Sequence, residues 1–371
     1  MIGGGIDAFI GEVHRKAMAL DAQFEFIAGA LSSTPEKSLR SGQELGLTRN
    51  YPSWQEMLKS EQALSKEERI DFVVIVTPNH LHFPVAKAFA RAGFNIVCDK
   101  PLVHTSQQAN ELKDIFQEKD IVFMLTHNYT GYPMVKQARH MVKAGQLGKI
   151  RKIVVEYNQG WLANNLAASG QKQASWRADP AKSGIAGAMA DIGSHAENLL
   201  SAISGLKIKE ICAELTSFVD GRLLDDDANI LLRLENNTKA VLMASQIAVG
   251  EENNLKISIF GEKASLIWKQ EDPNYLVYKS LDRPMQILKR GNDYLCKEAQ
   301  VASRLPSGHP EGFIEAFANI YLEFARALRA KQAGQNYSSF DFPTIHDGLR
   351  GVRFIEKTLE SAKSEKKWTR F

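Results

Sequence analysis

Residues 70–101, IDFVVIVTPNHLHFPVAKAFARAGFNIVCDKP, decide the fold of this chain. An apolar, β-branched run at 70–77 ends in a Pro-Asn pair, a helix-like stretch follows at 82–92, and Gly93 precedes a second apolar run. The order strand, helix, strand predicts two neighbouring strands of a buried parallel sheet. Lys100 then lies at the carboxyl end of a strand, where open α/β sheets bind their ligands.

The same alternation extends through the N-terminal part of the chain. Further helices are predicted at 9–20, 35–45, 54–64 and 106–118, and further strands at 24–31 and 121–126. Continuous apolar strands alternating with helices predict a doubly wound parallel sheet with helices on both faces. We therefore expect a first domain over residues 1–127.

The pattern changes after residue 127. Helices are predicted at 134–144 and 191–203, and longer strands at 150–159, 208–218, 227–234, 239–249, 255–260 and 264–269. These strands predict a second α/β domain over 128–371, with a large, mostly antiparallel, open-faced sheet. Long helices are expected at 310–330 and 345–361, the last of which can pack back on the first domain. An open face of this kind is often covered by a second copy, so we expect a homo-oligomer, either a dimer or a tetramer.

Composition narrows the class of protein. The chain has 371 residues, 44% hydrophobic and 24% charged, with a formal net charge of +3, which suits two soluble domains. The basic residues are scattered, so neither nucleic acid nor a membrane surface is an expected partner. Cys98, Cys212 and Cys296 are far apart and form no CxxC pair, which favours a reducing compartment over disulfides. Without a secretory signal or a spanning apolar run, the expected location is the cytoplasm.

The N-terminal sequence GGGIDA, residues 3–8, fits the dinucleotide-binding pattern G-x-G-x-x-[G/A]. In this pattern Gly3 allows a tight turn, Gly5 lets the backbone approach a pyrophosphate, and Ala8 keeps the next helix close to the sheet. The helix N-terminus offers unbonded amides to the phosphates. The alternative is a flexible glycine-rich terminus. The cofactor contacts predicted here are Gly3, Gly5, Ala8, Phe9 and Ile10.

A strand should precede the glycine turn, and only Met1 and Ile2 stand there. Either residues upstream of Met1 complete that strand or the strand is a stub, and the former is favoured because a central strand is hard to omit. At the end of the second predicted strand, Ser32 and Ser33 stand where an acid would hold the ribose 2′-hydroxyl of NAD. With hydroxyls and nearby cations in place of that acid, we expect Ser32 and Ser33 to contact the cofactor and NADP to be favoured over NAD.

Asp191 and His195 form the second candidate group. The two residues are four apart in a predicted helix and so share one face. His195 can accept the proton of a substrate hydroxyl while hydride leaves the same carbon, and Lys100 can polarise that oxygen. Asp191 can hold a neighbouring hydroxyl or orient His195. The alternative is an ordinary surface Asp-His pair.

The glycine turn, the sequence TPNHLH at 77–82, the step Asp99-Lys100-Pro101 and the Asp191/His195 pair together resemble the glucose-fructose oxidoreductase, inositol dehydrogenase and rhizopine catabolism (Gfo/Idh/MocA) family. The resemblance spans essentially the whole chain. It implies a Rossmann domain, a C-terminal α/β domain with an open sheet, and NAD(P)-dependent redox chemistry on sugars, cyclitols or related compounds.

By position, the resemblance implies that Lys100, Asp191 and His195 are the catalytic residues. It assigns the cofactor loop to Thr77, Pro78, Asn79 and His82. The step before Pro101 is usually Glu-Lys-Pro, so the shorter Asp99 leaves the role of that acid open. We count Asp99 and Lys100 among the cofactor contacts, and we expect a cis bond before Pro101.

Other residues are weaker candidates. Asn128 and Tyr129 follow a strand and either face the nicotinamide or form a plain turn. Trp161, Trp176 and Arg177 suit a hydroxylated substrate or a packed loop, and the polar segment 162–182 is a candidate lid. His309 can reach the substrate, while Pro310 and Glu311 are explained by the start of a helix. The substrate contacts expected in full are Lys100, Tyr129, Trp161, Trp176, Arg177, Asp191, His195 and His309.

No metal site is expected, because His104, His127, His140 and His346 lack ligand spacing. The sequence therefore predicts an NAD(P)-dependent oxidoreductase that moves a hydride between nicotinamide and a carbon of a sugar, cyclitol or related polyol. Two alternatives remain open, a dinucleotide-sensing regulator without catalysis and a glycosidase that uses NAD transiently.

Overall fold

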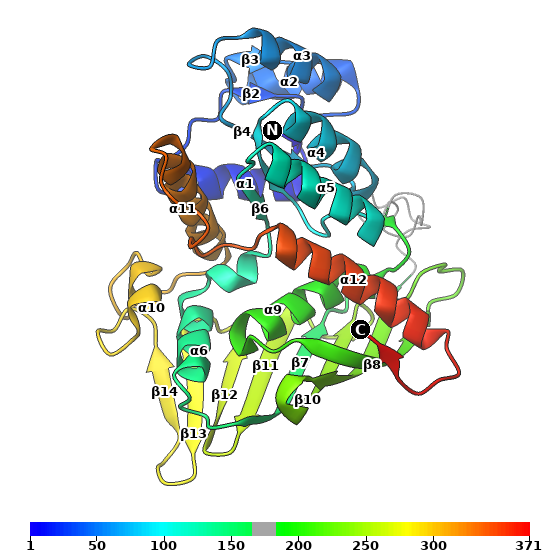
Figure 1. The fold of residues 1–371 in the computed structure, drawn as a ribbon, viewed down its shortest axis with the longest axis vertical. Coiled ribbons are helices and arrows are strands. Elements are labelled where there is room, and N and C mark those ends of the chain that lie inside the picture. Colours follow the sequence, from blue (N-terminus) through cyan, green and yellow to red (C-terminus); the bar gives the residue numbers. More distant parts are fainter. Residues whose placement is uncertain (165–182) are drawn as a thin grey trace. The chain divides into compact units, whose positions relative to one another are not determined.

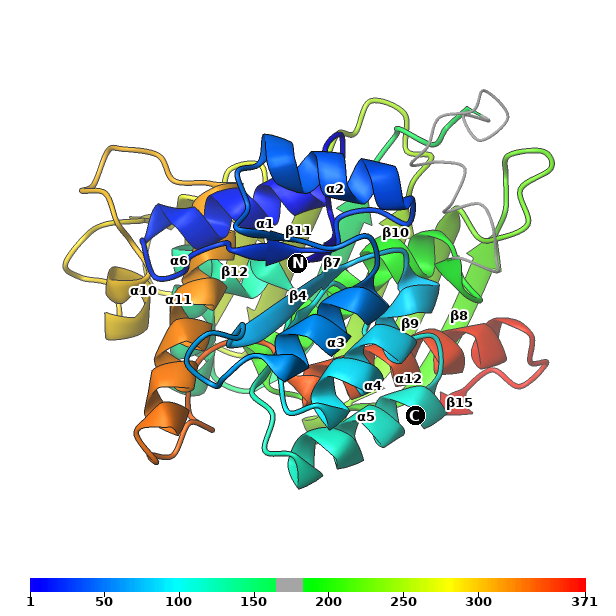
Figure 2. The same cartoon turned by 90° about the horizontal axis from the view of Figure 1, so that it is seen from above.

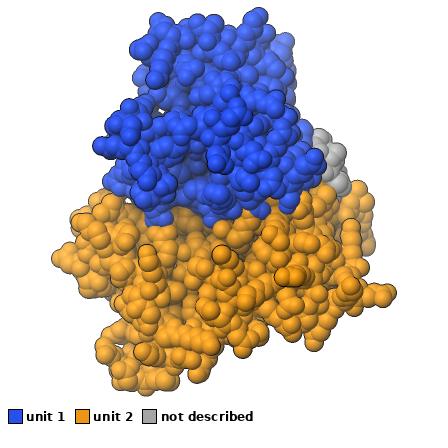
Figure 3. All heavy atoms as spheres, viewed as in Figure 1, with its two compact units in different colours: residues 1–127, 317–349 blue, residues 128–316, 350–371 orange. Residues whose placement is uncertain are grey.

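The structure is a computed structural model that describes residues 1–164 and 183–371. The chain divides into two compact units (Figure 3). Unit 1 comprises residues 1–127 and 317–349, and unit 2 comprises residues 128–316 and 350–371. Both units take segments from distant parts of the sequence. Each is built around its own sheet.

Unit 1 contains a parallel sheet with the strand order β1-β4-β5-β6, and β2 pairs with β3 beside it (Figure 1). Its strands are β1 Ile2–Gly3, β2 Ala28–Gly29, β3 Arg49–Asn50, β4 Phe72–Val76, β5 Asn95–Cys98 and β6 Phe123–Leu125. Its helices are α1 Phe9–Leu20, α2 Pro35–Glu44, α3 Trp54–Ala63, the 3-10 turn η1 Asn79–Leu81, α4 His82–Arg91 and α5 Ser106–Glu118. The predicted doubly wound parallel sheet is confirmed.

The first two strands are shorter than the sequence predicts. β1 has two residues, Ile2 and Gly3, which pair with Ile75 and Val76 of β4. The strand predicted at 24–31 is reduced to β2, because β3 offers it only two residues and β1 only a single bridge at Ala30. A ladder cannot extend beyond the strand that it pairs with.

Helices lie on both faces of the unit 1 sheet (Figure 2). Helix α4 packs on β4 and β5. On the other face α1 lies beside α11 (Phe313–Gln332), whose part from Phe317 onward belongs to unit 1. The Phe324 ring of α11 meets the Phe72 ring of β4 edge-on at 5.2 Å between centroids. A late segment of the chain thus completes the N-terminal core.

Unit 2 contains a nine-stranded sheet with the order β14-β13-β12-β11-β7-β10-β9-β8-β15. Its strands are β7 Ile150–Asn158, β8 Ile208–Thr216, β9 Asp227–Leu234, β10 Lys239–Ser245, β11 Asn254–Gly261, β12 Ala264–Lys269, β13 Tyr275–Ser280, β14 Gln286–Lys289 and β15 Thr369–Arg370. Strands β7 and β10 run parallel and the other neighbouring pairs run antiparallel. The predicted large, mostly antiparallel sheet is confirmed.

Helices pack on one face of this sheet (Figure 1). They are α6 Pro133–Lys143, α9 Ser194–Ser204, α10 Lys297–Val301 and α12 Ile345–Ala362, whose part from Arg350 onward belongs to unit 2. Unit 2 also contains the turns η2 Asn128–Gly131, η3 Met189–Gly193 (a π-helix) and η4 Glu235–Asn237, of which η4 joins β9 to β10. Alternate residues of β7, such as Ile153 and Val155, are fully buried against α9 and its neighbours. This alternation is the period of a sheet with one covered face.

Three features differ from the sequence prediction. The helix expected at 191–203 begins with the π turn η3, and the helix expected from Pro310 begins at Phe313. Strands β13, β14 and β15 were not predicted. β14 and β15 are the two edges of the sheet, and they are short and mostly exposed, so they lack a clear apolar pattern. Among the described residues, no helix combines the length and the apolar character needed to cross a bilayer.

Candidate active site

The glycine turn joins β1 to α1, and its shape requires the absence of side chains. Gly3 and Gly4 have φ angles of +76° and +71°, a conformation that glycine adopts without steric cost. A Cβ atom on Gly5 would lie 2.7 Å from Ser41 Oγ, and one on Gly11 would lie 2.2 Å from the Gly4 carbonyl oxygen. Gly11 therefore also lets α1 pack against the turn, a close approach that the sequence prediction assigned to Ala8.

The first turn of α1 suits an anion. Its N-cap residue, Ala8, makes no side-chain hydrogen bond to the helix amides, so these donors are available to a ligand. Phe9 is 68% exposed and Ile10 is half-buried. Asp7 has a φ of +66°, and its exposed carboxylate lies 3.6 Å from Nζ of Lys37. An acid thus stands inside the turn, a feature that the glycine pattern did not reveal.

The segment after β2 has no carboxylate at the position where an NAD-binding acid is expected. Ser32 is half-buried and Ser33 is exposed, and Ser32 Oγ accepts a hydrogen bond from the Thr34 amide at 3.2 Å. The nearby cation of Lys37 is shared with Asp7. This segment leaves hydroxyl groups at the predicted ribose end.

The loop after β4 carries the predicted cofactor contacts Thr77, Pro78 and Asn79. Thr77 Oγ1 is buried and has no hydrogen-bond partner among the described residues, which is costly unless a ligand supplies one. Together with the side-chain-free turn at Gly3 and Gly4, this orphaned hydroxyl fits a dinucleotide. The residues of unit 1 can therefore hold the cofactor that the sequence implies.

His82 has a different role from the predicted one. Its side chain is 0% exposed, with Nδ1 2.8 Å from the Pro101 carbonyl oxygen and Nε2 3.0 Å from that of Thr77. Burial lowers the pKa of His82, although the hydrogen bond to Pro101 opposes that change. Both ring nitrogens thus face backbone carbonyl oxygens, one of which accepts the single N–H of the neutral ring. Because the ring is fully buried, the predicted direct contact of His82 with a cofactor is corrected. The ring instead ties the cofactor loop to the segment that carries Lys100.

Lys100 follows β5 at the carboxyl end of the sheet, as predicted, and is half-buried. The peptide bond from Lys100 to Pro101 is cis, which confirms the expectation. The amide of Asp99 donates to the Ile75 carbonyl oxygen at 3.0 Å and so continues the pairing of β5 with β4. The backbone just before Lys100 is therefore held by the sheet.

The carboxylate of Asp99 is held by two other side chains. Oδ1 of Asp99 lies 2.5 Å from Thr126 Oγ1 and 3.4 Å from Nε2 of His14. Burial raises the pKa of the Asp99 carboxyl, but the hydrogen bonds from His14 and from the Thr126 hydroxyl oppose it, and the pKa is lowered overall. Sequence reasoning missed His14, whose only signal was its place on the apolar face of α1.

In unit 2, Asn128 and Tyr129 begin the turn η2 and are both buried. Asn128 Nδ2 has no hydrogen-bond partner among the described residues. The Tyr129 ring meets the His195 ring edge-on, with 4.9 Å between centroids, and the Tyr157 ring lies 6.2 Å from it. The structure thus brings Tyr129 to the candidate base and adds Tyr157, which sequence reasoning missed.

Asp191 and His195 stand on either side of a change in helix type. Asp191 is in the π turn η3, and His195 is the second residue of α9 and 8% exposed. Single π turns are frequent at functional sites. Gln246, just after β10, donates from Nε2 to Asp191 Oδ2 at 2.8 Å. Sequence reasoning missed this amide, which comes from a strand end 55 residues away.

The backbone that leads into the π turn is also fixed. Asp225 accepts hydrogen bonds from the amides of Gly187 at 2.6 Å and Met189 at 2.7 Å. Burial raises the pKa of Asp225, although these two amides favour its ionised form. The position of Asp191 therefore depends on a carboxylate that belongs to the β8–β9 connection.

Neutral polar groups continue along the ends of β7 and β11. Tyr157 donates from its hydroxyl to Asn253 Oδ1 at 2.7 Å, and Gln159 Nε2 donates to the same oxygen at 2.8 Å. Trp161 Nε1 donates to Gln159 Oε1 at 3.0 Å, and the hydroxyls of Tyr129 and Tyr157 are 2.5 Å apart. Burial raises the pKa of both tyrosines, so both stay protonated. The result is an array of amides and phenols that can match a polyhydroxylated molecule.

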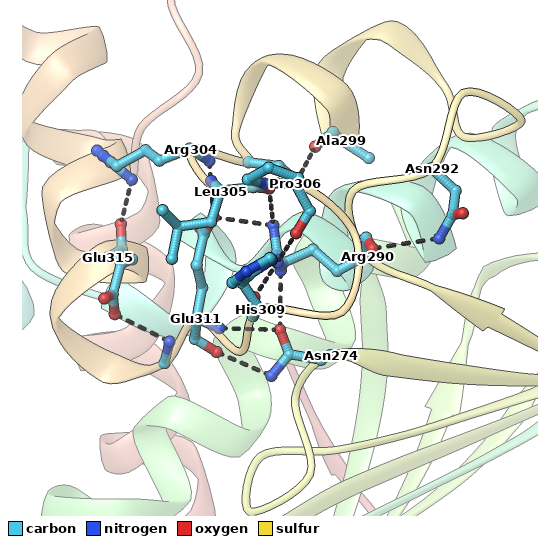
Figure 4. Close-up of polar contacts among 12 residues, drawn as sticks. Asn274, Arg290, Asn292, Ala299, Arg304, Leu305, Pro306, His309, Glu311 and Glu315 are labelled. Carbon is cyan, nitrogen blue, oxygen red and sulfur yellow. Dashed lines mark hydrogen bonds and ion pairs between the residues drawn. The ribbon is translucent and has the colours of Figure 1, made fainter.

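Some predicted residues lie elsewhere. Trp176, Arg177 and most of the candidate lid at 162–182 lie outside the described residues. The side chain of His309 is exposed, and its carbonyl oxygen accepts from Arg290 (Figure 4). The sequence predicts that Glu311 lies at the start of a helix, but the helix begins at Phe313. Glu311 is buried, and its Oε1 lies 2.8 Å from Nη1 of Arg290. This contact anchors the loop before α11.

One cluster of metal-ligand type emerges that the sequence spacing did not suggest. His140, Cys296 and Glu298 place one potential ligand atom each within 4.8 Å of the others. The Glu298 carboxylate takes a hydrogen bond from the Cys296 thiol and is near the His140 imidazole.

Comparisons with known proteins settle the family. Residues 1–129 match a model described as an oxidoreductase family with an NAD-binding Rossmann fold, and residues 135–267 match a model of the GFO/IDH/MocA C-terminal domain. An uncharacterized oxidoreductase of Bacillus subtilis, YfiI, is 34% identical over 100% of this chain and 96% of its own length. The chain belongs to the Gfo/Idh/MocA family.

Solved structures of family members agree with this assignment. An inositol dehydrogenase homolog from Azotobacter vinelandii complexed with NAD+ has a TM-score of 0.96 at 33% identity, covering 100% of this chain and 96% of that one. A complex of that homolog with NADH and myo-inositol has a TM-score of 0.94 at 32% identity, with the same coverage. Levoglucosan dehydrogenase of Pseudarthrobacter phenanthrenivorans is 27% identical over 73% of both chains. The Gfo/Idh/MocA chain described here is thus an oxidoreductase with an NAD-binding Rossmann fold.

Proposed function

We propose that the chain is an NAD(P)-dependent dehydrogenase acting on a CH–OH group of a sugar, cyclitol or related polyol. The observation that carries the proposal is the group of neutral polar side chains beside Asp191 and His195, made of Tyr129, Tyr157 and Gln246. Hydroxyl groups of a polyol can both donate to and accept from amides and phenols. The family relatives named as inositol and levoglucosan dehydrogenases support the same substrate class.

In this proposal three side chains act on one substrate. His195 accepts the hydroxyl proton as general base. Lys100 donates a hydrogen bond to the same oxygen and stabilises its developing negative charge. Asp191, oriented by Gln246, accepts a hydrogen bond from a neighbouring hydroxyl. The dinucleotide, when bound, supplies the hydride acceptor at nicotinamide.

A panel of sugars and inositols with each nicotinamide cofactor tests the proposal, followed at the absorbance of the reduced cofactor. Lys100→Ala and His195→Ala are each expected to abolish most turnover while dinucleotide binding is retained. Lys16→Ala and His346→Ala replace exposed residues and serve as controls. Unchanged turnover in both catalytic variants would end the assignment.

The same assays separate the two alternatives. A dinucleotide-sensing regulator would bind the cofactor and turn over no polyol. A glycosidase that uses NAD transiently would release product without net accumulation of reduced cofactor. The presence of Lys100, Asp191 and His195 together favours a dehydrogenase, because a sensor needs only the glycine turn.

We further propose that NADP(H) is accepted, and favoured over NAD(H). The hydroxyls of Ser32 and Ser33 and the cation of Lys37 suit a 2′-phosphate, and residues 30–34 carry no carboxylate. KM values for the two coenzymes test this proposal. Lys37→Glu should raise the KM for NADP and leave that for NAD within about twofold. Equal effects on both coenzymes would contradict it.

A homo-oligomer formed through the unit 2 sheet is also proposed. Leu231, Phe260, Tyr275 and Ile287 are strand residues that remain 40–47% exposed. Apolar strand residues of this kind are usually covered in an assembly. Light scattering should show a dimer or tetramer, and Leu231→Glu should weaken this assembly.

A cytoplasmic location is proposed as well. The three cysteines are free, which supports a reducing compartment.

A further inference from the structure

A row of hydrogen-bonded polar side chains crosses unit 1, all of them buried except Asp99, which is 17% exposed. The Tyr321 hydroxyl lies 2.5 Å from Nδ1 of His14, and Nε2 of His14 lies 3.4 Å from Oδ1 of Asp99. The same Oδ1 lies 2.5 Å from the Thr126 hydroxyl. These residues come from α11, α1, the end of β5 and the segment after β6. Four elements that are distant in the sequence are thereby joined through one carboxylate.

The donor and acceptor roles of Tyr321, His14 and Asp99 are compatible with one another. When Nε2 of His14 carries the proton and donates it to Asp99, Nδ1 is left as an acceptor for the Tyr321 hydroxyl. The His14 side chain is 0% exposed and packs edge-on against the Phe317 ring at 4.8 Å between centroids. Packing and hydrogen bonds together therefore hold the imidazole in one orientation.

The row of side chains from Tyr321 to Asp99 lies next to the proposed catalytic lysine and to the glycine turn. Asp99 directly precedes Lys100 and the cis peptide bond to Pro101. His14 is on α1, the helix that begins at the glycine turn. The contact between them links the proposed pyrophosphate-binding helix to the segment that carries the proposed catalytic lysine.

The electrostatic setting of Asp99 agrees with this role. The titratable groups that face it are His14 of α1, His82 of α4, and Tyr321 of α11 through His14, with Cys98 beside it in the chain. Burial and the charge of Asp99 raise the pKa of both Cys98 and Tyr321, so neither thiol nor phenol ionises near neutral pH. The carboxylate is the anion of this group.

We propose that Tyr321, His14 and Asp99 form a positioning relay that fixes the direction in which Lys100 is presented to substrate. The inference rests on the proposed function, in which Lys100 contacts the reacting oxygen. The relay residues touch neither substrate nor cofactor in this role, which replaces the cofactor contact expected for Asp99 from the sequence, because its Oδ1 is held by Thr126 and His14. They act through the backbone that Asp99 shares with Lys100.

The relay predicts a specific kinetic pattern. A misplacement of a catalytic group by about 1 Å can cost on the order of a hundredfold in rate. Asp99→Asn and His14→Phe should each lower kcat about tenfold to hundredfold, with KM and dinucleotide affinity within about twofold of wild type. The double variant should lose no more than the worse single variant, because both changes break the same relay. Asp99→Glu keeps the acid and should be at least about tenfold more active than Asp99→Asn.

Tyr321→Phe removes a single hydroxyl and covers the case in which His14→Phe does not fold. His346→Gln is the matched control, since His346 is exposed and belongs to the same unit. Additive losses in the double variant, or losses confined to KM, would overturn the relay.

A second readout works without any substrate. The rate at which an amine-acylating reagent modifies Lys100, relative to exposed Lys16 in the same molecule, is measured by mass spectrometry. The relay predicts that the ratio of Lys100 to Lys16 modification rates differs from that of wild type by at least about threefold in Asp99→Asn and in Tyr321→Phe. In His346→Gln this ratio should equal that of wild type. If the wild type binds NADH and oxidises no polyol, the proposed function fails while the relay is still decided by this ratio. A ratio equal to that of wild type in both relay variants would overturn the relay.

Discussion

Nε2 of Gln246 lies 2.8 Å from Oδ2 of Asp191, so an amide at the end of β10 holds a carboxylate in a π turn. Gln246 is 2% exposed. A buried amide bonded to a carboxylate has few alternative orientations. The direction of Asp191 is therefore set by a residue outside its own helix.

Gln246→Leu should lower kcat/KM for the polyol about tenfold to hundredfold. A hydrogen bond to a charged group contributes roughly 1.5–3 kcal/mol, and a factor of ten corresponds to about 1.4 kcal/mol. The measurement is steady-state kinetics on the best polyol of the panel. Gln286→Leu, on the exposed strand β14, is the control and should change kcat/KM by less than about twofold. Similar kinetics for the two variants would contradict the role of Gln246.

The helix and strand order of unit 1 was predictable because its signals are local. The run from 70 to 101 alternates apolar strand, helix and glycine stop, and the structure places β4, α4 and β5 within two residues of the predicted bounds. The short strands were not predictable in length, because the length of β2 depends on the residues that β1 and β3 offer it. Sequence patterns report a segment's own preference and not that of its partner.

The polar array of unit 2 was not predictable from sequence. Gln246 directly follows β10 and Asn253 directly precedes β11. Polar residues are common at such strand ends, so these two residues carry no signal of their own. Their meaning depends on which strand ends lie together, and the parallel pairing of β7 with β10 brings Gln246 toward Gln159. That Asp191 and His195 lie near each other was predictable, because both belong to one short segment.

Asp7→Gly should tighten dinucleotide binding. Asp7 has a φ of +66° inside the turn that is proposed to bind the pyrophosphate, and its carboxylate repels an anion there. One charge a few ångströms away costs about 1 kcal/mol in water, which corresponds to about fivefold in Kd. Glycine adopts this backbone conformation readily. Titration of NADH fluorescence measures the effect.

Asp114→Asn removes an exposed acid from α5 and is the control for this change. It should leave the Kd for NADH unaltered. Added salt should narrow the difference between wild type and Asp7→Gly, because exposed charges are screened. A larger Kd for NADH in Asp7→Gly than in wild type would contradict the prediction and would show that the carboxylate assists binding through Lys37.

His82 should make the stability of the protein depend on pH. Burial lowers its pKa in the folded state below the ordinary value of about 6.5. Below that pH the unfolded chain binds a proton that the folded state does not, so the stabilising contribution present above pH about 6.5 is lost as the pH falls. Urea unfolding at several pH values should show wild type losing more stability between pH about 7 and 5.5 than His82→Gln. The exposed His346→Gln variant should keep the wild-type pH slope.

Arg290 and Glu311 form a buried ion pair with side chains only 3% and 2% exposed and 2.8 Å between Nη1 and Oε1 (Figure 4). Nε of Arg290 donates to Asn274 Oδ1 at 2.9 Å. Arg290→Leu would leave the buried Glu311 carboxylate with backbone amide donors but without its cationic partner, so it should cost about 3–5 kcal/mol of unfolding free energy. Arg283→Leu breaks an exposed pair with Asp282 and should cost no more than about 1 kcal/mol. Urea denaturation measures both, and equal costs would mean that Arg290 does not anchor the loop before α11.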